Sequence, residues 1–337
     1  MLPRLPAIAL ILTLAATSVF ANPITKTTQS SVREISQPLV IGTGAVTGIY
    51  FPAAGAVQRL VNDQKAGVHL AIESTNGSIS NLQALESGTL ALAVAQSDWA
   101  YYAAKGGQAP FLRPNSELRT LLALHGELLA MIVKADSDIK DLDGLKGKKI
   151  NLGPSASGPR TIMTAVFATL NWGINEMGSI LDLPFAEQSA ALCDGRVDAI
   201  VFLVPHPNAA VQEALGRCPT RLLPLTGRAV DTLVTTNPFY SKSMIPGGSY
   251  TGISADIPSF GVRALLLGTT RLPDQAGYGI AKAVLGNTAT LNSLHPSLAR
   301  LTAPDMKADG FGIPIHAGVA KYMAEAGLSA PEPAPKP

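Results

Sequence analysis

Two turns rich in glycine and hydroxyl side chains carry the residue types best suited to bind a small anion. They are the runs 42–48 (Gly-Thr-Gly-Ala-Val-Thr-Gly) and 153–158 (Gly-Pro-Ser-Ala-Ser-Gly), and each lies between an apolar strand and a predicted helix. The N-terminus of a helix leaves backbone N–H groups unpaired and carries partial positive charge, which suits carboxylate or phosphate oxygens. The alternative is that both are only tight strand-to-helix turns.

A second pattern follows each turn further along the chain. The first copy is 86–94 (Glu-Ser-Gly-Thr-Leu-Ala-Leu-Ala-Val), and the second is 193–201 (Cys-Asp-Gly-Arg-Val-Asp-Ala-Ile-Val), an offset of 107 positions (193 minus 86). The repetition of both patterns predicts two similar lobes. Each lobe would present one helix N-terminus to a shared ligand.

Known catalytic motifs fit these turns poorly. A dinucleotide fingerprint requires a third glycine where Thr47 stands, and a nucleophile elbow requires glycine where Ser157 stands. The five histidines show no metal-ligand spacing. We therefore expect binding without catalysis, with no cofactor and no metal, and keep an extracytoplasmic enzyme as the weaker alternative.

The N-terminal residues 1–21 have the pattern of an export signal. Arg4 supplies the basic start, Ala7 to Ala16 the apolar core, and Val19-Phe20-Ala21 a cleavage site. The apolar core is shorter than the roughly 20 residues that a membrane-spanning helix needs. We expect a cleaved signal peptide and a periplasmic protein, with an uncleaved anchor as the alternative.

Charge and cysteine content narrow the class further. The formal net charge is +2 and no basic run appears, which argues against nucleic acid as a partner. Cys193 and Cys218 are 25 positions apart (218 minus 193). An oxidising compartment favours a disulfide between them, and two buried thiols are the alternative.

Short apolar runs alternate with helical stretches between a flexible lead-in (22–37) and a disordered proline-rich tail (330–337). This alternation predicts an α/β fold with parallel sheets. Separate strands are predicted at Leu118–Leu122 and Leu128–Val133, the second of which would cross between lobes, with the return near Phe260–Leu267. The predicted lobe 1 is then 38–125 plus about 261–329, and lobe 2 is about 126–260.

The chain resembles the TAXI family, the solute receptors of tripartite ATP-independent periplasmic (TRAP) transporters. The matching segments occur in order along the chain: Ile41-Gly42-Thr43-Gly44, Thr47-Gly48-Ile49-Tyr50-Phe51-Pro52, Ser74, Gly77-Ser78-Ile79-Ser80-Asn81-Leu82, Val94-Ala95-Gln96-Ser97-Asp98, Asp138-Ile139-Lys140-Asp141-Leu142, Gly144, Gly195-Arg196-Val197-Asp198-Ala199, Ile245-Pro246-Gly247-Gly248-Ser249-Tyr250, Ile315-His316-Ala317-Gly318, Tyr322 and Glu325-Ala326-Gly327-Leu328. Together they span nearly the whole mature chain.

The resemblance implies a type II-like, two-lobed periplasmic binding protein whose cleft closes about a hinge. It implies a small carboxylate ligand, such as glutamate or a dicarboxylate, and delivery to a TRAP-type permease by a monomeric receptor. A receptor for a membrane signalling protein is the alternative. Two departures from the family pattern bear on ligand choice: Pro159-Arg160 after the second turn, and His206-Pro207.

Fourteen residues are the candidate ligand contacts. Those of lobe 1 are Thr43, Gly44, Thr47, Tyr50, Ser78, Asn81, Gln96 and Ser97. Those of lobe 2 are Ser155, Ser157, Gly158, Arg160, His206 and Tyr250.

Several candidates have a structural alternative. Arg160 pairs with a ligand carboxylate if it faces inward, and is an ordinary surface arginine if it faces outward. Tyr50 is either a contact or a packing residue, Ser78 a contact or a helix cap, and His206 a donor or a capped loop residue. Tyr250 is included by resemblance alone.

Overall fold

The computed structural model describes residues 37–46, 48–154, 157–307 and 311–328. They lie in one compact unit, 35–337, and only this unit is considered below. The predicted export signal, the lead-in up to residue 36 and the proline-rich tail lie outside the described residues.

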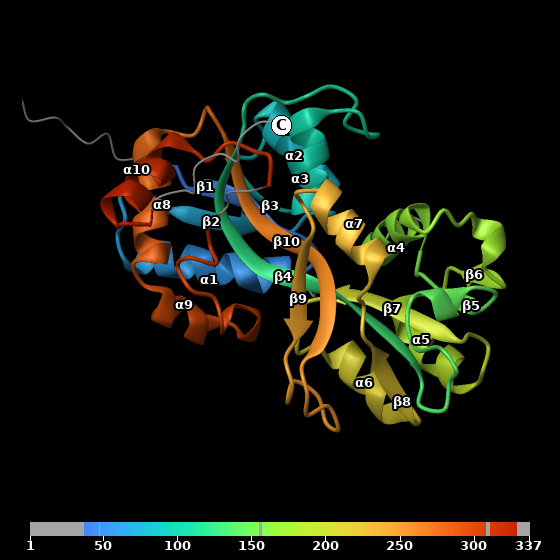
Figure 1. Ribbon diagram of the computed structural model, residues 1–337. Helices are drawn as coiled ribbons and strands as arrows, with labels where there is room; N and C mark the ends of the chain where they lie inside the picture. The colour runs from blue at the N-terminus through green and yellow to red at the C-terminus, as the bar shows by residue number, and fades with distance from the viewer. Residues whose placement is uncertain (1–36, 47, 155–156, 308–310, 329–337) are drawn as a thin grey trace, which may run out of the picture. The chain divides into compact units, whose positions relative to one another are not determined.

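Ten strands form one mixed sheet, ordered β2-β1-β3-β10-β4-β7-β5-β6, with β8 added beside β4 and β9 beside β10 (Figure 1). Their bounds are β1 Leu39–Gly42, β2 Leu70–Glu73, β3 Leu92–Gln96, β4 Leu118–Lys134, β5 Lys149–Asn151, β6 Ser179–Leu181, β7 Ala199–Val204, β8 Thr220–Leu223, β9 Ser241–Ile245 and β10 Ile257–Thr269. The prediction of parallel sheets is only partly right. Strands β1 to β3 and β5 to β7 pair in parallel, whereas β4 and β10 pair antiparallel with all their neighbours.

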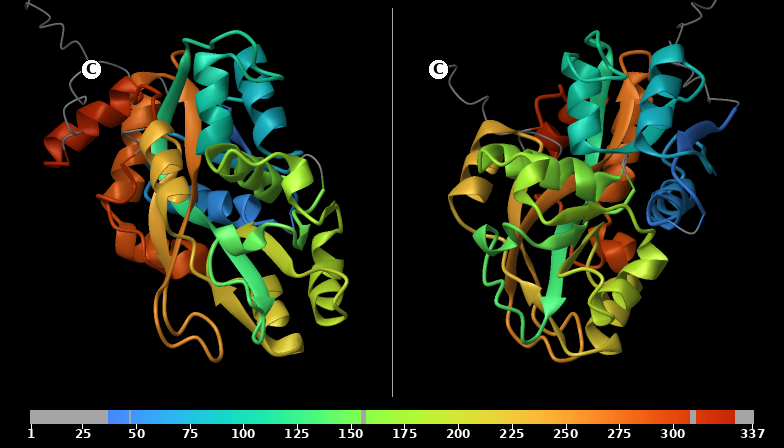
Figure 2. Two further views of the ribbon diagram at one scale, coloured as in Figure 1. Left: turned by 45° about the vertical axis from the view of Figure 1, so that its right-hand side comes forward. Right: turned by 90° about the vertical axis from the view of Figure 1, so that its right-hand side faces the viewer.

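Two long strands, β4 and β10, pass through both halves of the sheet. They pair with each other from Leu118 to Leu128, after which β4 pairs with β7 up to Val133. The two strands stay side by side in both views of Figure 2. The prediction of separate strands at 118–122 and 128–133 is therefore wrong, because the residues between them continue the β4 ladder. The predicted boundary after residue 125 falls within the pairing of β4 with β10, and the predicted boundary near residue 261 falls at its end. We keep the names lobe 1 and lobe 2 for the two halves.

The strands approach unusually closely at Gly261 of β10. A Cβ atom there would lie 1.9 Å from the backbone oxygen of Glu127. Any other residue would push β10 away from β4 at this point. Glycine is therefore required where the two strands leave lobe 1.

Lobe 1 has helices on both faces of its strands. Helices α1 (Tyr50–Asp63), α8 (Asp274–Leu285), α9 (Thr288–Leu294) and α10 (Ala317–Glu325) pack into one core, and α2 (Ser78–Ser87) and α3 (Ser97–Lys105) into the other. The residue after α2, Gly88, has a φ of 80° and ends the helix in the left-handed conformation expected of a glycine cap.

Lobe 2 repeats this layering, and β4 shows why. Its residues Leu129, Met131 and Val133 enter one core with α4 (Gly158–Thr169) and α7 (Arg228–Thr236). The alternating residues Leu128, Ala130 and Ile132 enter the other core with α5 (Phe185–Cys193) and α6 (Ala209–Arg217). Because successive side chains of a strand point to opposite faces, a continuous apolar run requires cover on both. Short 3₁₀ turns at Asp143–Leu145, Ile174–Glu176 and Pro296–Leu298 complete the elements.

Cys193 at the end of α5 and Cys218 directly after α6 form a disulfide in the structure. The bond ties together two neighbouring helices on one face of lobe 2. Both cysteines lie outside the strands that connect the lobes.

We predict that replacing both cysteines by serine lowers the free energy of unfolding by roughly 3 kcal/mol, since the bond closes a 25-residue separation. Denaturant unfolding of the variant and of the oxidised protein measures this difference. A loss below about 1 kcal/mol would show that the bond constrains the unfolded chain little.

Candidate functional site

A cavity of about 500 Å³ lies between lobe 1 and lobe 2. Its lobe 1 side is formed by the β1–α1 turn, the start of α2, the end of β3 and the middle of β4. Its lobe 2 side is formed by the end of β7 and the first turns of α5 and α6. The lining residues are Gly44, Gly48, Ile49, Tyr50, Gly77, Ser78, Gln96, Glu127, Phe185, Phe202, Leu203, Val204, Pro205, Asn208 and Ala210. We call this cavity the cleft.

Two helix N-termini of lobe 1 begin at the cleft. The first bond within α1 runs from the Ala53 N–H to the Ile49 carbonyl, and the corresponding bond of α2 runs from Asn81 to Gly77. The N–H groups of the first residues of each helix, other than Pro52, which has none, therefore lie outside the helical ladders, as at any helix start. Since Tyr50 and Ser78 line the cleft, both helix starts can offer donors and partial positive charge to an anion.

Glu127 places a carboxylate in the same cleft. Its residue is 6 % exposed, and its Oε2 accepts a hydrogen bond of 2.8 Å from the Gln96 side-chain amide. Its Oε1 lies 3.6 Å from His125 Nε2 and accepts no hydrogen bond from the described residues. Burial raises the pKa of the Tyr50 hydroxyl well above its usual value, and the neighbouring Glu127 carboxylate raises it further. Tyr50 is therefore a neutral donor at physiological pH.

The opposite wall of the cleft is largely apolar. Phe185, Phe202, Leu203, Val204 and Pro205 line it, and the Phe185 and Phe202 rings stack with their centroids 5.8 Å apart. Phe185 is 42 % exposed, which is high for a phenylalanine. The two lobes thus present different chemistry to the space between them.

Three predicted contacts of lobe 1 are buried and hydrogen-bonded to protein carbonyls, two within lobe 1 and one in lobe 2. The Thr43 hydroxyl donates to the Glu73 carbonyl at 2.7 Å. The Asn81 amide donates to the carbonyls of Thr43 and Val94. The Ser97 hydroxyl donates to the Phe239 carbonyl. All three residues are 0 % exposed, so we no longer assign them to the ligand.

Four predicted contacts of lobe 2 also have internal partners. The Arg160 guanidinium donates to the carbonyls of Gly153 and Leu181 and pairs with Asp182, so it braces its own turn instead of facing a ligand. The Ser157 hydroxyl donates to the Leu152 carbonyl.

The side chains of His206 and Tyr250 are hydrogen-bonded to each other, and the Tyr250 hydroxyl also accepts a hydrogen bond from the Asn208 N–H. The second nitrogen of His206 lies 3.4 Å from the Leu128 carbonyl. Burial lowers the pKa of His206 to about 4 against the opposing effect of that carbonyl. A neutral histidine with both nitrogens engaged is a structural residue, as is its tyrosine partner.

Four predicted contacts do line the cleft: Gly44, Tyr50, Ser78 and Gln96. A fifth, Gly158, begins α4 close to lobe 1, since a Cβ atom there would lie 3.4 Å from Gln96 Nε2. These five residues remain predictions as ligand contacts. The last two predicted contacts, Thr47 and Ser155, lie outside the described residues.

Glu127 was missed by the sequence reasoning, although a signal was present. It is the one Asp, Glu, Lys or Arg between Thr120 and Val133, inside a run that is otherwise apolar apart from His125 and Gly126. A carboxylate in a buried strand needs either a partner or a function.

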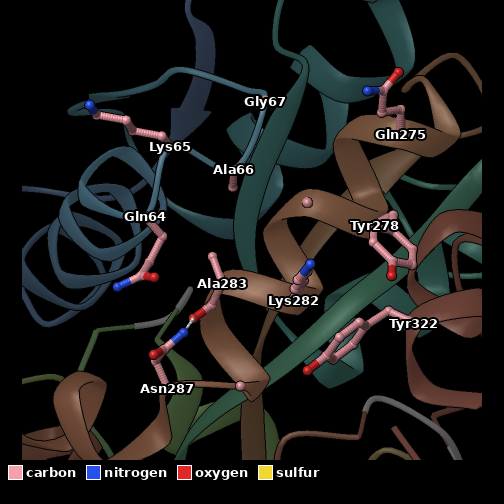
Figure 3. A pocket seen from close by; sticks show the side chains of 12 residues that line it. Gln64, Lys65, Ala66, Gly67, Gln275, Tyr278, Lys282, Ala283, Asn287 and Tyr322 are labelled. Carbon is pink, nitrogen blue, oxygen red and sulfur yellow. Dashed lines mark hydrogen bonds between the residues drawn. The ribbon is translucent and has the colours of Figure 1, made fainter. Parts of the chain in front are cut away.

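A second cavity, of about 540 Å³, lies within lobe 1 between the α1–β2 connection and helices α8 and α10. Figure 3 shows the Lys282 side chain and the Tyr322 hydroxyl directed toward its centre. All its lining residues belong to lobe 1, so a ligand there would not contact lobe 2. We therefore place the candidate site in the smaller cleft.

Among the described residues, no cluster of three or more His, Cys, Asp or Glu side chains could hold a metal ion. No described helix is both long and apolar enough to cross a membrane.

Asp98 is a buried carboxyl at the start of α3, next to Ser97, whose hydroxyl donates to the carbonyl of the lobe 2 residue Phe239. It is 1 % exposed, and its Oδ2 has no hydrogen-bond partner among the described residues. Burial raises the pKa of Asp98 to about 7 against the opposing hydrogen bond from the Trp99 N–H, and the Glu127 carboxylate raises it further. The folded protein therefore holds this proton up to a higher pH than the unfolded chain does.

We predict that Asp98→Asn stabilises the protein at pH 8 and has little effect at pH 4. The folded-state pKa lies above the unfolded value near 4, so ionisation weakens the wild type as pH rises from about 4 to 7. The difference at pH 8 is expected to reach up to roughly 4 kcal/mol. Denaturant unfolding across this pH range tests it, and parallel stability curves for both proteins would contradict it.

Solved structures of solute-binding proteins are similar to this chain. A TctC solute-binding protein from Polaromonas, solved without ligand, matches at a TM-score of 0.54 and 16 % identity, covering 87 % of this chain and 99 % of that one. The periplasmic aliphatic sulphonate-binding protein SsuA from Escherichia coli matches at a TM-score of 0.48 and 15 % identity, covering 88 % and 94 %. The first similarity supports the two-lobed periplasmic binding protein fold.

The family comparison covers most of the sequence. The model of the NMT1-like family matches residues 41–327, from the end of β1 to the residues after α10. This range includes every residue that lines the cleft. The chain is a member of the NMT1-like family with the fold of a periplasmic solute-binding protein.

Proposed function

We propose that this protein is an extracytoplasmic receptor that closes on a small carboxylate-bearing solute and delivers it to a membrane permease. One observation carries the proposal: the cleft lies between the two lobes and is bordered by the N-termini of two helices, α1 and α2. Such ends bind carboxylate oxygens through backbone N–H groups. A solute held by both lobes would stabilise the closed arrangement, which a permease can recognise.

The chemistry of the cleft supports binding over catalysis. Its described side chains offer one carboxylate (Glu127), two amides (Gln96 and Asn208) and two hydroxyls (Tyr50 and Ser78). The Ser78 hydroxyl accepts a hydrogen bond from the Gln96 backbone N–H. Among these described residues no nucleophile is hydrogen-bonded to a histidine base, which acyl-transfer enzymes require. We therefore propose a receptor without enzymatic activity.

The finer identity follows from the sequence resemblance. It supports a TAXI-type receptor in the periplasm, acting as a monomer with a TRAP-type permease driven by an ion gradient. It also makes dicarboxylates and acidic amino acids such as glutamate the first solutes to test.

We predict that a small carboxylate raises the thermal unfolding temperature of the purified protein. A solute at 100 times its Kd adds roughly 2.7 kcal/mol to stability. The panel should contain glutamate, glutarate, succinate and neutral amino acids, with sugars as the contrasting class. A shift with a sugar and with none of the carboxylates would refute the proposal.

A matched pair of variants locates the site. Ala210→Trp fills the cleft and should abolish the shift, because Ala210 lines the cleft at the start of α6. Gln64→Trp fills the lobe 1 cavity of Figure 3 and should leave the shift unchanged. The reverse result would move the site to lobe 1.

A further inference from the structure

We propose that the solute of the cleft is a zwitterion with one ammonium group, one carboxylate and an uncharged side chain, and that the ammonium group binds Glu127. The inference rests on the proposed function of the cleft and names the class of carboxylate that it accepts. The solute's single carboxylate would bind at the N-termini of α1 and α2. Its uncharged side chain would lie against the apolar wall of lobe 2.

Glu127 has the features of a cation site. Gln96 fixes Oε2 in place, while Oε1 accepts no hydrogen bond from the described residues. A carboxylate that is 6 % exposed and only half satisfied is costly unless a cation or donors complete it. An ammonium group brings three N–H donors and the opposite charge.

No described lysine or arginine near the cleft pairs with Glu127. His125 Nε2 lies 3.6 Å from Oε1, within ion-pair distance for a protonated ring but too long for a hydrogen bond, so it leaves Oε1 open to a donor. Arg160 is paired with Asp182, and Arg263 donates to the carbonyls of Leu124 and Asp305. Neither lysine nor arginine occurs among the lining residues.

The charge balance of the cleft disfavours a second carboxylate on the solute. Such a group would have no lysine or arginine of the lining to pair with, and would lie near either Glu127 or the apolar wall. Like charges in a shared site destabilise each other, and an unpaired anion against phenylalanine and proline loses its hydration. The stacked Phe185 and Phe202 rings instead suit methylene and methyl groups.

A series of five-carbon acids separates these requirements. Norvaline (2-aminopentanoate) has the ammonium and an apolar side chain, pentanoate lacks the ammonium, glutamate adds a second carboxylate, and glutarate has two carboxylates and no ammonium. Titration calorimetry at pH 7.5 gives each Kd. We expect norvaline to bind roughly 10- to 100-fold more tightly than pentanoate, the range for a charged hydrogen bond, and more tightly than glutamate, with glutarate weakest.

The variant Glu127→Gln tests the assigned residue. It keeps the shape of the side chain and removes its charge, so the preference for norvaline over pentanoate should fall to within about threefold, because the charged hydrogen bond is lost. Glu86→Gln is the matched control, since Glu86 is exposed and absent from the cleft lining. It should keep the full preference. Thermal unfolding of both variants confirms that they fold.

The outcomes distinguish this inference from the function on which it rests. Tighter binding of pentanoate or glutarate than of norvaline would overturn the ammonium group, and tighter binding of glutamate would overturn the absence of a second charge. Each result leaves the carboxylate receptor standing. An unchanged preference in folded Glu127→Gln would remove Glu127 from the site. Failure of the folded wild type to bind any acid of the series, or any of the wider panel, would refute both.

Discussion

The antiparallel pairing of β4 with β10 is the constraint on which the rest of the structure depends. The two strands belong to both lobes, so their register fixes how the edges of the two half-sheets face each other. Gly261 allows them to approach at Glu127, where β4 leaves one set of neighbours for the other. The carboxylate proposed to bind the solute therefore stands on the element that joins the lobes.

Each lobe has its own copy of the glycine-rich turn, and the two copies have different surroundings. In lobe 1 the turn before α1 reaches the cleft and offers backbone donors beside Tyr50. In lobe 2 the equivalent turn is braced by Arg160, which holds the Gly153 and Leu181 carbonyls. The charged and hydrogen-bonding groups are thus concentrated on one side of the cleft, and the other side contributes an apolar surface. Such a division suits a solute with one polar end.

Local patterns predicted most of the framework from sequence. Strand–helix alternation and the Gly88 cap follow from short-range preferences, and the repeated turns indicated two lobes before any contact was known. The use of individual side chains was harder to predict. Thr43 and Ser97 directly follow strands and Asn81 lies in the first turns of α2, places where ligand contacts occur. Their hydrogen bonds nevertheless reach residues 30 to 142 positions away. The sequence shows which residue types lie near a site. It does not show which hydroxyls and amides donate to carbonyls far away in the chain and so cannot donate to a ligand.

The strand order also has a consequence for the order in which the chain assembles. In lobe 1 the central strand β10 lies between β3 and β4, which do not pair with each other. A chain that emerges from its N-terminus can therefore complete the lobe 2 ladder of β4 to β7 well before residue 269 arrives. Until then β3 and one edge of β4 expose unpaired backbone groups, which are the groups that promote aggregation. Residues 257–269 thus close the sheet last, and the exposed edges of β3 and β4 are most open to aggregation in that interval.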